Sequence, residues 1–350
     1  MRPVVTTIAL ILIAALAGFA AERLSVPLPF LLGPLCVTAL IATALPAALP
    51  DGYVFPNWLR MVFIAIIGLM IGAQVTPQLF ENAGRLMTST LALTVFVIMA
   101  FAYNYAVFRR IGGYDRATAF YSSSPGGLYE SLSLGEDAGA DMPRLILQQF
   151  LRVIVVVTVL PIGLSLWLGT PVGSAGGMTL ARPSVPLADL PVILAVGGIG
   201  ILAGKFLRLP AGQLTGPMSV AAVISLSGLF ALDVPQWLVN DAQIVIGTAL
   251  GMRFTGLSRS LVLRSIGLTL ISVGGMLAAA ALFALLLAPI AGEGFDVMLI
   301  SFAPGGVTEM ALVALSLQAN PALVTLHHIL RILITVILLT FSARRLKRAL

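Results

Sequence analysis

The sequence predicts an all-α polytopic membrane protein made of two homologous repeats, each with about five to six transmembrane helices and one broken helix. Of its 350 residues, 59% are hydrophobic and 10% are charged, and the mean hydropathy is +1.05. A soluble domain is about 25% charged, so this chain cannot cover a surface that faces water. A Pro-Gly-Gly motif occurs in both halves. The 34 Gly and 21 Pro exclude a bundle of plain helices.

Charge and cysteine usage exclude further classes. The lone Cys36 supports neither a disulfide framework nor a cysteine-based metal site. A net charge of +6 would indicate nucleic acid in a soluble protein. Here, however, several basic residues directly follow an apolar run, at Arg344, Arg345, Lys347 and Arg348. The positive-inside rule then places the C-terminus in the cytoplasm, and we expect no nucleic-acid partner.

The first apolar segment has two interpretations. Arg2 before it and Gly18-Phe19-Ala20 after it resemble a secretory signal with a cleavage site. The alternative is a retained first helix. We expect retention, because the same segment recurs in mid-chain, where no signal peptide can stand.

The chain reads as a duplication. The motif that starts at Pro125 reappears 179 positions later at Pro304. The same offset pairs Pro56 with Pro235, Trp58 with Trp237, Gly68 with Gly247, Gly72 with Gly251, Ser122 with Ser301, and Arg152 with Arg331. Upstream the offset is 183, which pairs Gly33-Pro34 with Gly216-Pro217. We therefore expect a first membrane repeat at 1–168, a linker rich in Gly, Pro and Ser at 169–188, a second repeat at 189–343 and a basic tail at 344–350.

Each repeat holds six apolar segments. They lie near 4–22, 28–48, 57–76, 87–108, 115–135 and 144–168, and near 189–207, 211–232, 236–252, 262–288, 295–318 and 322–343. Lipid admits only helices or closed barrels, and runs without polar alternation exclude a barrel. The basic residues leave open whether the repeats are parallel or inverted, and the sequence does not decide whether the chain forms a homo-oligomer.

The fifth segment of each repeat carries a predicted helix break. Pro removes a backbone donor, and two glycines add backbone freedom. The breaks comprise Ser122, Pro125, Gly126 and Gly127, and Ser301, Pro304, Gly305 and Gly306. Paired broken helices indicate a transporter's binding site. The alternative is a packing kink, since Gly and Pro are common in membrane helices.

Two charges per repeat lie beside these breaks. Glu130 and Glu309 follow the second glycine by three residues, and an ionisable residue at this depth predicts a functional site. The alternative role is capping of the freed N–H groups. Arg152 and Arg331 follow in the sixth segment. They would pair with the glutamates, bind an anionic substrate or snorkel to a headgroup.

His327-His328 occupies the place that Gln148-Gln149 holds in the first repeat. Adjacent histidines on a helix point about 100° apart and cannot share a metal as an i, i+4 pair does. The chain has no other histidine, so we expect no metal site and no cofactor. A proton relay through His327 and polar packing between helices are the remaining roles.

The segments SSSPGGLYE and SFAPGGVTEM, with the turns PLPFLLGP and LPAGQLTGP, resemble the AbrB membrane protein family. The resemblance covers nearly the whole chain and implies a bacterial inner-membrane protein. Members carry labels of ammonia monooxygenase and regulator of gene expression. The name is shared with a small soluble DNA-binding regulator, which this chain does not resemble. The breaks are more distantly similar to those of cation/proton antiporters and bile-acid-type symporters, but the paired acidic residues of many antiporters are missing.

Three functions remain open. The first is a secondary transporter or exporter of a small polar or anionic solute, with proton coupling through Glu130 or Glu309. The second is a regulatory membrane protein that alters gene expression indirectly. The third is a membrane-bound monooxygenase, which has too few metal ligands. The sequence favours the first, and with it a protein that is not an enzyme.

Overall fold

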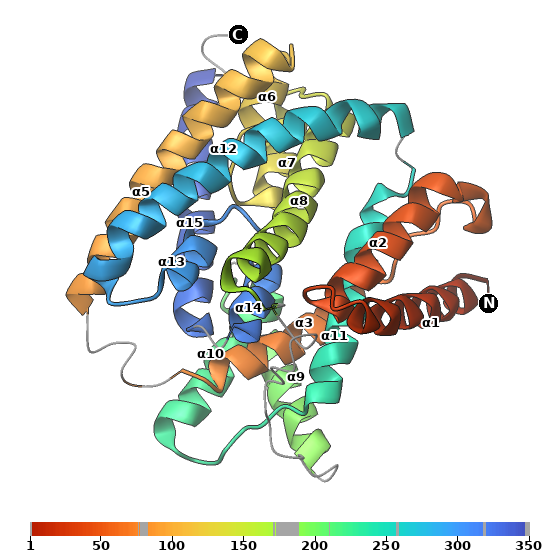
Figure 1. The fold of residues 1–350 in the computed structure, drawn as a ribbon, viewed down its shortest axis with the longest axis vertical. Helices are drawn as coiled ribbons and strands as arrows, with labels where there is room; N and C mark the ends of the chain where they lie inside the picture. The colour runs from red at the N-terminus through yellow and green to blue at the C-terminus, as the bar shows by residue number, and fades with distance from the viewer. Residues whose placement is uncertain are drawn as a thin grey trace. The chain divides into compact units, whose positions relative to one another are not determined.

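The computed structural model describes residues 2–75, 77, 83–170, 172, 189–209, 211–256, 259–317 and 320–346. This part of the chain is helical throughout, with 14 α-helices and short 3-10 and π turns (Figure 1). Five helices are long and apolar enough to cross a membrane: α1 (Arg2–Arg23), α5 (Ala83–Ala106), α8 (Met142–Leu168), α12 (Arg259–Ala291) and α15 (Pro321–Leu346). The predicted all-α, multi-pass membrane class is therefore confirmed.

The helices fall where the apolar segments predict them. The shorter helices are α2 (Pro29–Ala44), α3 (Asn57–Gly72), α9 (Leu190–Phe206), α10 (Gly212–Ser227) and α11 (Gln236–Gly251). The fifth segment of each half is two helices, as its Pro-Gly-Gly motif predicts. These are α6 (Arg116–Ser122) with α7 (Leu128–Asp137), and α13 (Phe295–Phe302) with α14 (Val307–Ser316). Most of the predicted linker, residues 173–188, and the end of the tail, residues 347–350, lie outside the described residues.

The chain forms two compact units, and each takes residues from both halves. Unit 1 comprises Met1–Glu81, Leu160–Leu257 and Ala311–Ala322. Unit 2 comprises Asn82–Val159, Ser258–Met310 and Leu323–Leu350. The first three helices of each half thus build unit 1, and all residues that the sequence nominates as a site belong to unit 2.

In unit 1, glycines let helices from different halves touch backbone to backbone. α3 packs on α10, and α11 packs on α2. A Cβ on Gly68 would overlap the carbonyl oxygen of Leu214, and a Cβ on Gly247 would overlap that of Leu31. Small residues at helix contacts are the usual means of close approach in membranes. The packing of unit 1 therefore requires glycine at both positions.

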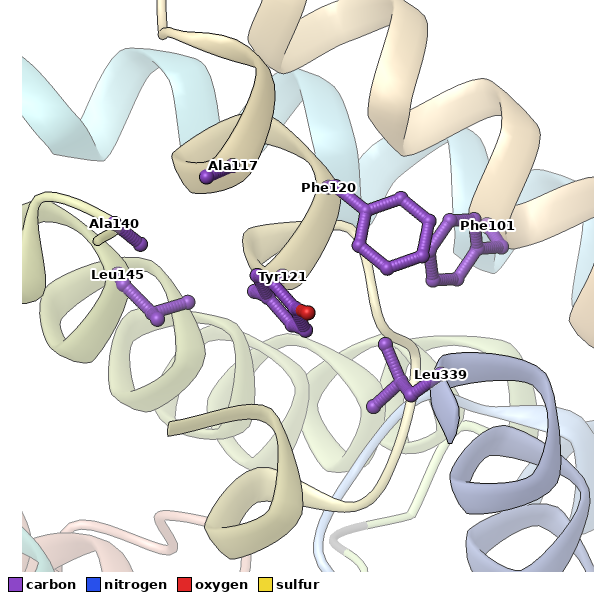
Figure 2. Close-up of a cluster of buried hydrophobic side chains, with 7 residues drawn as sticks. All are labelled: Phe101, Ala117, Phe120, Tyr121, Ala140, Leu145 and Leu339. Carbon is purple, nitrogen blue, oxygen red and sulfur yellow. The ribbon is translucent and has the colours of Figure 1, made fainter. Parts of the chain in front are cut away.

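In unit 2, aromatic side chains pack against α6 and α13, the half-helices that precede the two breaks. α6 presents Tyr121 and Phe120 to a buried cluster that Phe101 of α5 and Leu339 of α15 complete (Figure 2). The seven residues of this cluster are Phe101, Ala117, Phe120, Tyr121, Ala140, Leu145 and Leu339. A second group brings together Phe96, Phe283 and Phe302, with ring centroids 5.5–5.7 Å apart and the Phe96 ring edge-on to the other two. These contacts hold α6 and α13 in place up to the residue at which each is interrupted.

Candidate functional site

The first break runs from Ser123 to Gly127, between α6 and α7. Asp115 starts α6 by accepting a hydrogen bond from the Thr118 N–H at 2.9 Å. Gly127 ends the break with φ +60° and ψ 53°, in the left-handed region that favours glycine. The second break runs from Ala303 to Gly306, between α13 and α14. Both segments are interrupted at the predicted prolines.

Pro125 leaves one backbone carbonyl without its intrahelical hydrogen-bond donor, and a side chain takes the place of that donor. In an uninterrupted helix, the N–H at this position would donate to the carbonyl of Tyr121, four residues earlier, but proline has no N–H. Gln149 of α8 donates to that carbonyl oxygen instead, with its Nε2 at 3.0 Å. The Ser131 hydroxyl of α7 donates to the same oxygen. The buried carbonyl is thus satisfied, as buried backbone groups must be.

In the second break, Pro304 likewise leaves the carbonyl of Ile300 without an intrahelical donor. His328 of α15 bonds to this carbonyl instead, with its Nε2 at 3.0 Å from the oxygen. Since a carbonyl only accepts, this ring is protonated on Nε2, and its Nδ1 has no partner among the described residues. Gln149 and His328 therefore both donate a hydrogen bond to the carbonyl four residues before the proline of a break.

The remaining carbonyls of the first break also meet side chains. Gln149 Nε2 lies 3.3 Å from the Ser122 carbonyl oxygen, and Asn104 Nδ2 lies 3.3 Å from that of Ser123. Arg152 donates through Nη1 to the Ser124 carbonyl oxygen at 3.0 Å. The end of a helix leaves its last carbonyls without intrahelical donors, and three side chains from α5 and α8 supply them here.

Arg331 plays the matching part in the second break. It donates through Nη1 to the Ala303 carbonyl and through Nη2 to the Gly305 carbonyl, the latter at 2.5 Å. Ala303 lies 179 positions after Ser124, as Arg331 does after Arg152. The nominated serines are less involved: Ser301 donates within α13 to Val297, at 2.8 Å, and Ser122 Oγ is buried without a partner in the described chain.

Both arginines are buried. Arg152 is 6% exposed and Arg331 is 1% exposed. In the part of the chain that the structure describes, neither forms an ion pair, and the Nε of each has no acceptor. The expected pairing of these arginines with Glu130 and Glu309 is therefore not observed. The freed carbonyls of the breaks take the guanidinium donors instead, and snorkelling is excluded by the burial.

The glutamates fold back over the starts of the second half-helices. Glu130 Oε2 lies 3.3 Å from the position that a Cβ on Gly127 would take, and the Glu309 carboxylate lies against Gly306 in the same manner. Both residues are in the first turn, of α7 and α14 respectively, where the helix dipole favours negative charge. Both are partly exposed. Their placement matches the capping role as well as the functional one.

Arg331 contacts the second break and lies beside the first. A Cβ on Gly126 would lie 3.4 Å from Arg331 Nε and 3.4 Å from Thr335 Oγ1. Gly127 borders Thr335 and Val336 of the same helix. α15 therefore passes along the first break while its arginine holds the second.

The two histidines face different neighbours. His327 Nδ1 lies 3.0 Å from the Leu323 carbonyl oxygen, and Nε2 lies 3.0 Å from the Ser89 hydroxyl oxygen of α5. His328 faces the second break. Among the described residues no group of three His, Cys, Asp or Glu could hold a metal. Gln148, the counterpart of His327, bonds Tyr114 and Thr269 at 2.9 and 2.8 Å.

Sequence reasoning missed Asn104 and Ser131. Asn104 is 1% exposed, and besides Ser123 it bonds Ser272 of α12 at 2.7 Å. The available signal was a single amide inside the apolar segment 87–108. An isolated polar residue in a membrane helix is costly unless it has a partner.

Comparison with known proteins gives concordant matches. A protein-family model described as "Transition state regulatory protein AbrB" matches residues 39–347. A Bacillus subtilis (strain 168) protein named "Uncharacterized protein YhjN" is 26% identical over 94% of this chain and 90% of its own. An Escherichia coli (strain K12) protein named "Putative regulator AbrB" is 27% identical over 86% of this chain and 92% of its own. The residues that the family model matches include both breaks.

Proposed function

Because the chain belongs to the AbrB family of membrane proteins, we propose that it is a bacterial inner-membrane secondary transporter or exporter that moves a small polar or anionic solute. One observation carries the proposal: both helix breaks lie in unit 2, and each is held by a buried arginine. An interruption survives in a membrane only where protein packs around it or where it lines a wet cavity. Transporter sites typically use such half-helices.

The proposal includes the internal duplication. Contacts within unit 1 support it, because Gly68 meets Leu214 while Gly247 meets Leu31. Both glycines and both leucines are related by the offsets found in the sequence, so each half supplies the glycine for one contact and the carbonyl for the other. Repeats of this kind underlie many transporters. We assign the repeats to 1–168 and 189–343.

Proton coupling through Glu130 or Glu309 is part of the same proposal. Both carboxylates lie at half-helix starts in unit 2 and are partly exposed. A carboxylate at such a place can take up and release a proton with the transport cycle. The test is Glu309→Gln in proteoliposomes. Flux that loses its dependence on a pH gradient supports coupling, and flux unchanged at every pH contradicts it.

The transport proposal itself is tested by flux in proteoliposomes. Arg152→Gln removes one buried guanidinium, and Arg144→Gln is its control on the same helix, with a side chain that is 44% exposed. We expect solute flux to fall by about tenfold or more in the first variant and little in the second. Absence of flux for every small polar or anionic solute, in protein shown to be folded, contradicts the proposal.

The orientation follows from the basic tail, so we place the C-terminus in the cytoplasm. A reporter fused after Leu350 tests this, since green fluorescent protein matures on the cytoplasmic side and alkaline phosphatase is active on the other.

A regulatory role is the second candidate, favoured by the name of the Escherichia coli relative. It would follow indirectly, through transport of an effector. If the purified protein binds DNA specifically, the regulatory role is direct and the transport proposal loses its ground.

A further inference from the structure

Unit 2 buries two arginine side chains, Arg152 and Arg331. Each of these side chains is at most 6% exposed. Their hydrogen bonds in the described chain go only to neutral carbonyl oxygens. Burying a charge is costly unless an opposite charge compensates it. The arrangement is therefore incomplete without an anion.

The first break provides the place for that anion. α7 starts at Leu128, and the first N–H groups of a helix have no intrahelical acceptor. The positive end of the helix dipole lies at the same point. Gly126 and Gly127 carry no side chain, and the unpartnered Nε of Arg331 lies 3.4 Å from the position that a Cβ on Gly126 would take. An amide nest and a guanidinium N–H thus converge from two different segments.

We infer that this convergence is an oxyanion subsite, which binds a carboxylate or phosphate group of the transported solute between the first turn of α7 and Arg331 Nε. The inference rests on the proposed transport function and specifies its substrate as an oxyanion. Arg331 is suited to this role because its Nη atoms are hydrogen-bonded to the Ala303 and Gly305 carbonyls. These bonds orient Nε toward the first break.

Glu130 indicates how the subsite behaves without solute. Its Oε2 lies beside Gly127, so a carboxylate of the chain already faces the start of α7. A solute oxyanion would compete with Glu130 for the same donors. Glu130→Gln should therefore tighten oxyanion binding, whereas Arg331→Gln should weaken it.

The test uses full-length protein in nanodiscs of phosphatidylcholine. Thermal unfolding is followed as inorganic phosphate or succinate is added at ionic strength held constant with chloride. We expect a saturable rise in melting temperature with at least one probe. Arg331→Gln should raise the concentration for half-maximal effect about tenfold or more, and Arg144→Gln should leave it unchanged. Equal shifts in wild type and Arg331→Gln, or no shift at any concentration, overturn the inference.

Two variants guard against a fold defect in Arg331→Gln. Arg331→Lys keeps the charge but lacks the planar fork, so weak binding is expected in folded protein. Gly126→Ala places a methyl group 3.4 Å from Arg331 Nε, without a change of charge, and should also weaken binding. Wild-type binding in both variants contradicts the subsite.

A lipid headgroup has the same chemistry as a free phosphate. The experiment is therefore repeated in nanodiscs that contain phosphatidylglycerol. If the anionic lipid stabilises the protein through Arg331 and abolishes the effect of free anions, the occupant is a lipid and the inference is wrong. If free anions still act, the solute assignment stands.

The inference and the transport proposal fail separately. Flux of a neutral solute without oxyanion binding contradicts the subsite alone. Oxyanion binding that depends on Arg331, with no flux of any bound anion in proteoliposomes, contradicts transport alone.

Discussion

Gln149 and His328 make the same hydrogen bond in two different breaks. Each donates, at 3.0 Å, to the carbonyl oxygen four residues before a proline. Each therefore replaces the N–H that the proline lacks. Two chemically different side chains have the same task because both carry a donor on a planar group of similar reach.

This relationship predicts that donor chemistry, and not residue identity, matters at position 149. Gln149→Leu should lower the free energy of unfolding by about 1–3 kcal/mol, because it leaves the Tyr121 carbonyl with fewer donors. Gln149→His should retain most of the stability. Unfolding by sodium dodecyl sulfate in mixed micelles measures both. Equal loss in the two variants would contradict the donor argument.

Gly127 should tolerate no side chain. Its φ of +60° costs an L-residue about 1–2 kcal/mol, and a Cβ would approach Glu130 Oε2 to 3.3 Å. Gly127→Ala should therefore lower thermal stability. The control is Gly274→Ala in α12, where no atom lies within 4 Å of the new Cβ. That change should be neutral or stabilising, since alanine favours helix. A harmless Gly127→Ala would mean that the break relaxes into another conformation.

Unit 1 should be as sensitive at Gly68. A Cβ there meets backbone of α10, which cannot rotate away, so Gly68→Ala should cost about 1–3 kcal/mol by overpacking. Gly198→Ala in α9 faces open space and serves as the matched control. The comparison is made by melting temperature in detergent. Similar melting temperatures for the two variants would refute the close contact.

Metal chelation should change neither stability nor flux. His327 has both ring nitrogens within hydrogen-bond distance of Leu323 and Ser89, and His328 offers a single Nδ1. A structural or catalytic zinc needs three or four protein ligands. The measurement is melting temperature and flux before and after EDTA. A loss on chelation that zinc or copper restores would disprove this prediction and revive the monooxygenase alternative.

The fold was largely predictable because lipid narrows the options. Long apolar runs must be helices, and the Pro-Gly-Gly motifs mark where two of them stop. Helix ends agree with the predicted segments within a few residues. The interleaving of the two units was not predictable, since α3 meets α10 across about 150 residues of chain and hydropathy carries no information on such pairing.

At the site, residue positions were predictable but their partners were not. Arg152 and Arg331 were recognisable as rare charges in apolar runs, and a glutamate seemed the natural partner. The sequence does not show that a break exposes several carbonyls at once, which compete for the guanidinium. Asn104 went unnoticed because one amide on a distant segment carries no spacing signal.

The interleaved units also bear on biosynthesis. The ribosome adds about 5–20 residues per second, so α3 waits on the order of ten seconds before α10 is made. During that time Gly68 and Gly72 present bare helix backbone to lipid, with no partner of their own half to cover it. Unit 2 waits longer still, until α15 has been inserted. The nascent first half is therefore an open intermediate, exposed to membrane quality control until the second half closes it.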